Sequence, residues 1–86
     1  MSIKSKQQLP KWFEGDVYSE GGIVKNRFSG EEYKLNNVEL SMYDLVMGST
    51  ICIEMGMVNE SILNSHRKGL DWFRMNNAEA YMILLD

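Results

Sequence analysis

The sequence has few of the residues that cross-link or interrupt a small domain. It contains one cysteine, one proline and one histidine in 86 residues. The single cysteine, Cys52, allows no intramolecular disulfide, and the sequence has no set of Cys and His from which a structural zinc site could be assembled. We therefore expect a protein of a reducing compartment. Its stability must come from packing alone, and a domain of this length has a small free energy of unfolding.

Long apolar runs and an excess of basic residues are missing too. No run approaches the roughly 18 apolar residues that span a bilayer, and the first eight residues lack the hydrophobic stretch of a signal peptide. We expect a cytoplasmic protein with no membrane contact. Lys and Arg total 9 against 12 Asp and Glu, a net charge of −3, which argues against a broad basic surface for nucleic acid.

The side chains that carry out catalysis are sparse. His66 lies on the apolar side of its expected helix beside Arg67, which favours a partly buried histidine with a hydrogen-bond partner over a general base. Cys52 lies in an apolar run, the setting of an inert thiol. Neither the clustered acids nor the glycine-containing turns have the spacing of a metal or phosphate loop. We expect no enzyme activity, catalytic residue, metal or cofactor.

The first part of the chain predicts a lead-in followed by a hairpin. Residues 1–11 are polar and lysine-bearing, typical of a flexible solvated tail, with an anchoring arm as the alternative. Residues 12–86 form a single domain. Within it, residues 23–35 alternate apolar and polar side chains on either side of Ser29-Gly30, which predicts a β-hairpin.

A first helix is expected from Val38 to about Met55. Asn36-Asn37-Val38-Glu39 has the form of a capping box. Apolar residues cover nearly the whole helical wheel. The narrow arc that they leave for solvent holds four residues, Glu39, Tyr43, Thr50 and Glu54. The helix should therefore form the centre of the core or of a homodimer, although residues 50–57 could instead be extended.

A second, two-faced helix is expected from Asn59 to Asn76, after a stop at Gly56. Its polar stripe advances by steps of 4, 3, 4 and 3 and consists of Glu60, Asn64, Arg67, Asp71 and Arg74. Gly69, on the other side, would permit close approach of another element. Asn76-Asn-Ala-Glu79 repeats the capping-box form, so residues 78–85 predict a short third helix, with a strand as the alternative.

These elements predict an α+β fold. An N-terminal β-hairpin or small antiparallel sheet packs on two antiparallel helices, and a short C-terminal helix docks against them.

Protein contact is the function that these observations favour. Trp72 falls at the edge of the apolar side, near Lys68 and Met75, where its ring is either a lid on the core or an exposed anchor. Together with Arg67 and Arg74 these residues form the expected partner-binding face. The alternative is a small nucleic-acid-associated regulator of helix-turn-helix type, which the acid Asp71 within the basic stripe opposes.

The sequence also resembles a known group of proteins. Residues 69–74, Gly-Leu-Asp-Trp-Phe-Arg, with Asn77 and Ala80-Tyr-Met-Ile-Leu-Leu-Asp86, are similar to small uncharacterised proteins encoded by marine bacteriophages, especially those of cyanobacteria. Arg27-Phe-Ser-Gly-Glu31, where the group would have a proline in place of Arg27, and Met42-Tyr-Asp44 fit the same group. The resemblance covers the last two-thirds of the chain. It implies a phage accessory or host-directed protein that acts in the bacterial cytoplasm, and it implies no site residues.

Overall fold

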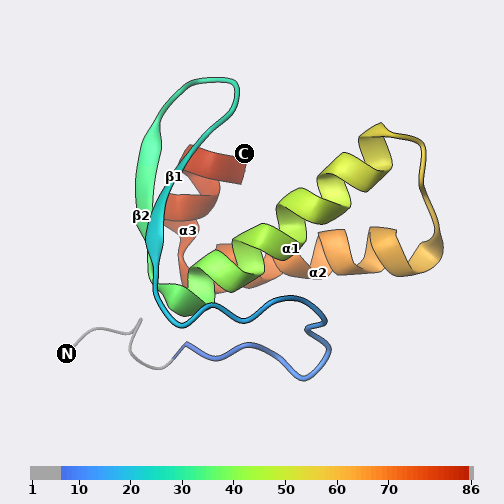
Figure 1. The fold of residues 1–86 in the computed structure, drawn as a ribbon, viewed down its shortest axis with the longest axis horizontal. Coiled ribbons are helices and arrows are strands. Elements are labelled where there is room, and N and C mark those ends of the chain that lie inside the picture. The colour runs from blue at the N-terminus through green and yellow to red at the C-terminus, as the bar shows by residue number, and fades with distance from the viewer. Residues whose placement is uncertain (1–6, 86) are drawn as a thin grey trace.

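The computed structural model describes residues 7–85, which form one α+β unit (Figure 1). Strands β1 (Gly22–Lys25) and β2 (Glu32–Leu35) come first. They are followed by helices α1 (Asn37–Glu54), α2 (Glu60–Asn76) and α3 (Ala78–Ala80), which continues into the π-helix η2 (Tyr81–Leu85). The predicted fold class and the order of its elements are confirmed.

The hairpin has the predicted antiparallel pairing, with Gly22 opposite Leu35 and Lys25 opposite Glu32. Its turn is built around Asn26, a residue that sequence reasoning did not single out. The Asn26 Oδ1 atom accepts hydrogen bonds from the backbone N–H groups of Phe28 (2.7 Å) and Ser29 (3.0 Å). Gly30, with φ of +80°, closes the turn in a backbone conformation that favours glycine.

Helix α1 begins at the predicted capping box. The Asn36 side chain accepts a hydrogen bond from the Glu39 N–H (2.8 Å), and Glu39 Oε1 accepts one from the Asn36 N–H (2.9 Å). The helix continues to Glu54, so residues 50–54 are helical and not extended. The prediction that Glu39 faces solvent is wrong: this residue is 1% exposed, because side chains from two other segments also bind its carboxylate.

Helix α2 packs against α1 at the predicted glycine. A Cβ atom added at Gly69 would lie 2.5 Å from the Val46 Cγ2 atom, so the lack of a side chain there sets how closely the helices approach. The predicted polar stripe faces outward, and its spacing brings two pairs, Arg67–Asp71 and Asp71–Arg74, within reach of each other, of which the second forms. Arg74 pairs with Asp71 at 2.8 Å, whereas Arg67 binds the Asn64 side chain at 2.6 Å.

The C-terminal residues form the helical alternative, not a strand. The cap is Asn77, whose Oδ1 accepts from the Ala80 N–H at 3.1 Å. The capping box predicted between Asn76 and Glu79 does not form, because the cap is Asn77 and the residue three positions after it is Ala80. Glu79 instead accepts a hydrogen bond from the Tyr33 hydroxyl.

The residues that precede the hairpin lie against the helices. Gln7 donates to Glu39 (3.0 Å), and the Gln8 carbonyl accepts from the Trp72 indole N–H (3.2 Å). Leu9 packs on the core. The lead-in predicted over residues 1–11 is therefore held to the core from Gln7 onward, and residues 1–6 lie outside the described part of the chain.

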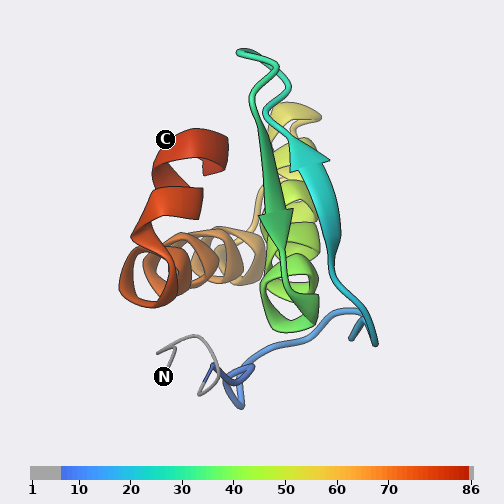
Figure 2. The same ribbon diagram turned by 90° about the vertical axis from the view of Figure 1, so that its left-hand side faces the viewer.

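The remaining segments lie on two sides of the pair formed by α1 and α2. In Figure 1 the N-terminal segment (blue) lies below α1 and α2, while the hairpin and the C-terminal helix rise above one end of them. Figure 2 shows the hairpin and the C-terminal helical segment in front of the helix pair. Within residues 7–85, no helix has both the length and the apolar character needed to cross a membrane.

Candidate interaction surfaces

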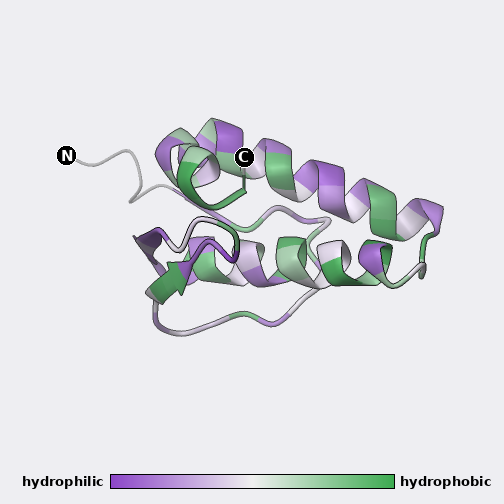
Figure 3. Cartoon of the chain, turned by 90° about the horizontal axis from the view of Figure 1, so that it is seen from above, coloured by the Kyte–Doolittle hydropathy of each residue, from purple (hydrophilic) through white to green (hydrophobic). Residues whose placement is uncertain are grey.

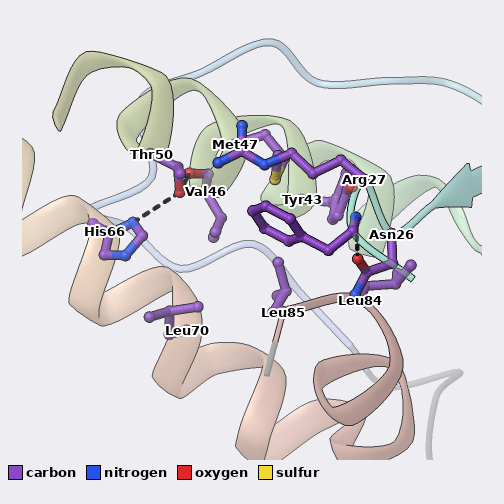
Figure 4. Close-up of a pocket in the computed structure, with 11 residues that line it drawn as sticks. Asn26, Arg27, Tyr43, Val46, Met47, Thr50, His66, Leu70, Leu84 and Leu85 are labelled. Carbon is purple, nitrogen blue, oxygen red and sulfur yellow. Dashed lines mark hydrogen bonds between the residues drawn. The ribbon is translucent and has the colours of Figure 1, made fainter. Parts of the chain in front are cut away.

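A groove lies where the hairpin turn, α1, α2 and η2 meet (Figure 4). Its volume is about 210 Å³. Its apolar lining includes Val46, Met47, Leu70, Leu84 and Leu85. Polar groups at its edges belong to Asn26, Arg27, Thr50 and His66. Tyr43 also lines it, and burial raises the pKa of the Tyr43 hydroxyl, an effect that the nearby Arg27 partly offsets.

The hairpin turn holds an aromatic ring at the edge of this groove. Phe28 lines the groove, yet 86% of its surface is exposed. The Arg27 guanidinium lies 5.0 Å from the centre of the ring and also pairs with Glu54 on α1. The ring therefore stands at the edge of the groove with most of its surface open to solvent.

A second apolar surface lies at the turn between α1 and α2. We call it the tip cluster, and its five side chains, each 45–69% exposed, are Ile51, Met55, Met57, Val58 and Leu63. Figure 3 shows this turn as a hydrophobic segment at the end of the helix pair. Gly56, with φ of +81°, ends α1 as predicted, and the Met57 N–H returns to the Cys52 carbonyl at 2.8 Å. This backbone arrangement is a Schellman motif, which holds the turn in one conformation.

Of the residues expected to bind a partner, Trp72 lies inside the fold. It is 8% exposed and packs edge-on against Phe73, with 5.2 Å between ring centres. Its N–H is bound by Gln8. The structure thus favours the core-lid alternative over the exposed anchor.

The other four expected residues are exposed on α2 but are partly engaged by neighbours. Lys68 lies 5.7 Å from the centre of the Trp12 ring. Arg74 binds Asp71 and also the Tyr81 hydroxyl at 2.7 Å, and the hydrogen bond to Tyr81 raises the pKa of its guanidinium. Arg67 binds Asn64. Met75 is the apolar residue of this set, and 86% of its surface is exposed to solvent.

His66 has the environment that the sequence predicts. Its Nδ1 atom lies 3.1 Å from the Ser49 hydroxyl and 3.4 Å from the Thr50 hydroxyl, and the ring is partly buried. Both hydroxyls also donate to the Val46 carbonyl. His66 therefore joins α2 to α1 through hydroxyl groups and has no carboxylate partner among the contacts in residues 7–85.

No group of three or more His, Cys, Asp or Glu in the described part of the chain is placed to hold a metal ion. Glu39 is fully buried, but three N–H donors occupy its carboxylate. That carboxylate serves to hold three segments together.

Comparisons with protein-family models, with curated proteins and with solved structures find no match for this chain.

Sequence reasoning missed both apolar surfaces. Ile51 and Met55 of the tip cluster were counted as part of an apolar helix that needs cover, Leu63 was counted on the apolar side of the second helix, and Phe28 was counted as a strand residue of the hairpin. Two signals could have pointed to the tip: apolar residues on both sides of Gly56, where a helix stop would expose them, and two methionines among them.

Proposed function

We propose that this protein is a small non-enzymatic interaction module that binds another protein through the tip cluster. One observation carries the proposal: five apolar side chains, each about half exposed or more, are gathered at one end of the helix pair. Contiguous apolar surface of a few hundred Å² on a small domain commonly marks a contact site.

The chemistry of the tip cluster suits a protein surface. Met55 and Met57 have flexible, polarisable side chains that adapt to an irregular apolar partner. The Schellman motif at Gly56 supports binding as well, because a turn that is already ordered loses little conformational entropy when it docks. Glu54 and Glu60 border the cluster and supply a polar rim of the kind that surrounds apolar contacts.

The resemblance to phage proteins supplies the proposed context. In that context the partner is a protein of a bacterial host, the compartment is the bacterial cytoplasm, and the module changes the activity of what it binds. The nucleic-acid alternative gains no support, because Arg67 and Arg74 are engaged by neighbouring side chains and Asp71 lies between them.

Affinity capture from a bacterial lysate tests the proposal. The tagged protein is compared with a Met55→Lys/Val58→Lys double variant and with a matched control, Met75→Lys/Met82→Lys, which changes two exposed apolar residues away from the tip. The proposal expects specific captured proteins to be lost with the tip variant and kept with the control. Equal capture by all three proteins would contradict it.

A further inference from the structure

The groove and Phe28 are a hole and a projection placed side by side on one face of the molecule. Phe28 forms part of the edge of the groove, while 86% of its surface is exposed. A two-fold symmetric contact between identical chains requires one patch that is complementary to itself. A hole beside a projection of matching size meets this requirement.

The projection is held firmly in place. The buried side chain of Asn26 accepts from the Phe28 N–H at 2.7 Å and donates to the Ile83 carbonyl at 2.8 Å. The turn is therefore tied to the C-terminal helix, whose next residues, Leu84 and Leu85, line the groove. Because one side chain fixes the turn against an element that lines the groove, Phe28 needs little ordering before it can bind.

The groove has the right volume and enough apolar lining to hold a phenyl ring. Its volume is about 210 Å³, and an apolar cavity of about 150 Å³ is enough to accommodate benzene. Its walls include three leucine side chains, one valine and one methionine, and contact with them would remove a large part of the ring from water.

We propose that a second copy of this chain occupies the groove, so that the Phe28 ring of each copy inserts into the groove of the other around a two-fold axis. This contact uses a different surface from the tip cluster and does not depend on the proposed function.

The charges at the edge of the groove fit this occupant. Arg27 lines the groove and pairs with Glu54, which lies one helical turn beyond the groove residue Thr50. The edge thus carries one cation and one anion. Around a two-fold axis, Arg27 of each copy can exchange its own Glu54 for Glu54 of the other copy, so two ion pairs between the copies replace the two within them and no charge is left unmatched.

The area of this contact predicts weak association. Each inserted ring removes roughly 150–250 Å² from water. Two rings with their groove walls give an interface at the small end of the range for specific complexes, below about 1,200 Å². We therefore expect a dissociation constant on the order of 10 μM to 1 mM.

Sedimentation equilibrium of the purified full-length chain tests the contact. We expect the average mass of the wild type to rise toward that of a dimer as the concentration increases to about 1 mM. Phe28→Ser should stay monomeric. Ile23→Ser, which changes an exposed apolar residue of the same hairpin, should behave as the wild type. A wild type that is monomeric at the highest concentration, or unchanged association of Phe28→Ser, overturns the proposal.

Variants that reverse the charge at Arg27 or Glu54 distinguish an ion pair between two copies from an ion pair within one chain. Arg27→Glu and Glu54→Arg each place like charges across both contacts of a dimer, and each should weaken association by at least roughly tenfold. An equimolar mixture of the two variants places opposite charges across both contacts and should restore association. A mixture that associates no better than either variant contradicts the two-fold arrangement. The mixture also reports on folded protein, because a variant that failed to fold could not be rescued.

Neither outcome bears on the tip cluster. The self-association experiment contains no other protein and changes none of the five apolar residues of the tip cluster. Glu54 borders that cluster, but Phe28→Ser and Arg27→Glu leave both the cluster and its rim unchanged. The lysate experiment in turn leaves Phe28, Arg27 and Glu54 unchanged. Failure of one proposal is therefore distinguishable from failure of the other.

Discussion

The Glu39 carboxylate accepts a hydrogen bond of 2.7 Å from the side-chain amide of Asn77, 38 positions further along the chain. Each of these residues also takes part in capping a helix: Glu39 completes the capping box of α1, and Asn77 caps α3. Gln7 donates to the same carboxylate oxygen of Glu39. One buried carboxylate therefore joins the N-terminal segment to the starts of two helices.

Replacement of Glu39 by glutamine should destabilise the fold although the shape of the side chain hardly changes. The carboxylate accepts three N–H groups, from Asn36, Gln7 and Asn77, and an amide places its own donor against at least one of them. We expect the free energy of unfolding to fall by about 2 kcal/mol, the scale for hydrogen bonds to a charged group. Urea unfolding measures this. The control is Glu60→Gln, the same change at an exposed acid in the first turn of α2, which should cost less than about 1 kcal/mol. Equal losses for the two variants would contradict the central role of Glu39.

Two glycines in the helix pair should respond to alanine in opposite directions. At Gly69 the new methyl would lie 2.5 Å from Val46 Cγ2, so Gly69→Ala should destabilise the fold by about 1–3 kcal/mol despite its better helix propensity. At Gly48 nothing lies within 4 Å of the new methyl, so Gly48→Ala should stabilise the fold by about 0.5–1 kcal/mol. Thermal unfolding of both variants provides the check, and a Gly69→Ala variant at least as stable as the wild type would show that the close helix contact is misplaced.

Deletion of residues 1–11 should cost stability. The deletion removes the Gln7 donor of Glu39, the Gln8 acceptor of Trp72 and the packing of Leu9. We expect a loss of at least about 2 kcal/mol, because each lost hydrogen bond contributes about 1 kcal/mol and the apolar contact adds to it. The midpoint of urea unfolding is the measurement. An unchanged midpoint would mean that this segment is a dispensable tail after all.

Tyr43 should contribute to the loss of stability at alkaline pH. Burial raises the pKa of its hydroxyl in the folded protein above the unfolded value of about 10. Below that value the hydroxyl is protonated in both states, so pH has no effect through this group. As the pH rises past about 10, the unfolded chain releases its proton first, and stability falls. Tyr43→Phe should therefore make the decline between pH 9 and pH 11 shallower in thermal unfolding. Parallel declines for the two proteins would contradict the assigned environment.

Local patterns predicted those parts of the fold that depend on neighbours in sequence. The capping box at Asn36, the helix stop at Gly56 and the hairpin pairing all arise within a few residues, so the sequence alone could indicate them. The burial of Glu39 could not be predicted, because two of its donors come from Gln7 and Asn77.

The sites depend on the relative placement of distant elements. Asn26 has the pattern of an ordinary turn residue, and its second role depends on the Ile83 carbonyl, 57 positions away. Trp72 was placed at the edge of the apolar face, and the partner of its indole N–H is the Gln8 carbonyl, 64 positions away. The tip cluster is exposed because the hairpin and the C-terminal helix stand at the other end of the helix pair (Figure 1).

The most direct test of the interaction function uses the seven methionines of the chain as reporters. The protein is labelled at its methionine methyl groups with ¹³C, and its NMR spectrum is recorded before and after addition of unlabelled bacterial lysate. If the tip cluster binds a protein, the Met55 and Met57 signals should shift or broaden, while those of the exposed Met75 and Met82 stay in place. Signals of all four residues that change equally, or none that changes, would contradict the assignment of the tip cluster as the contact surface.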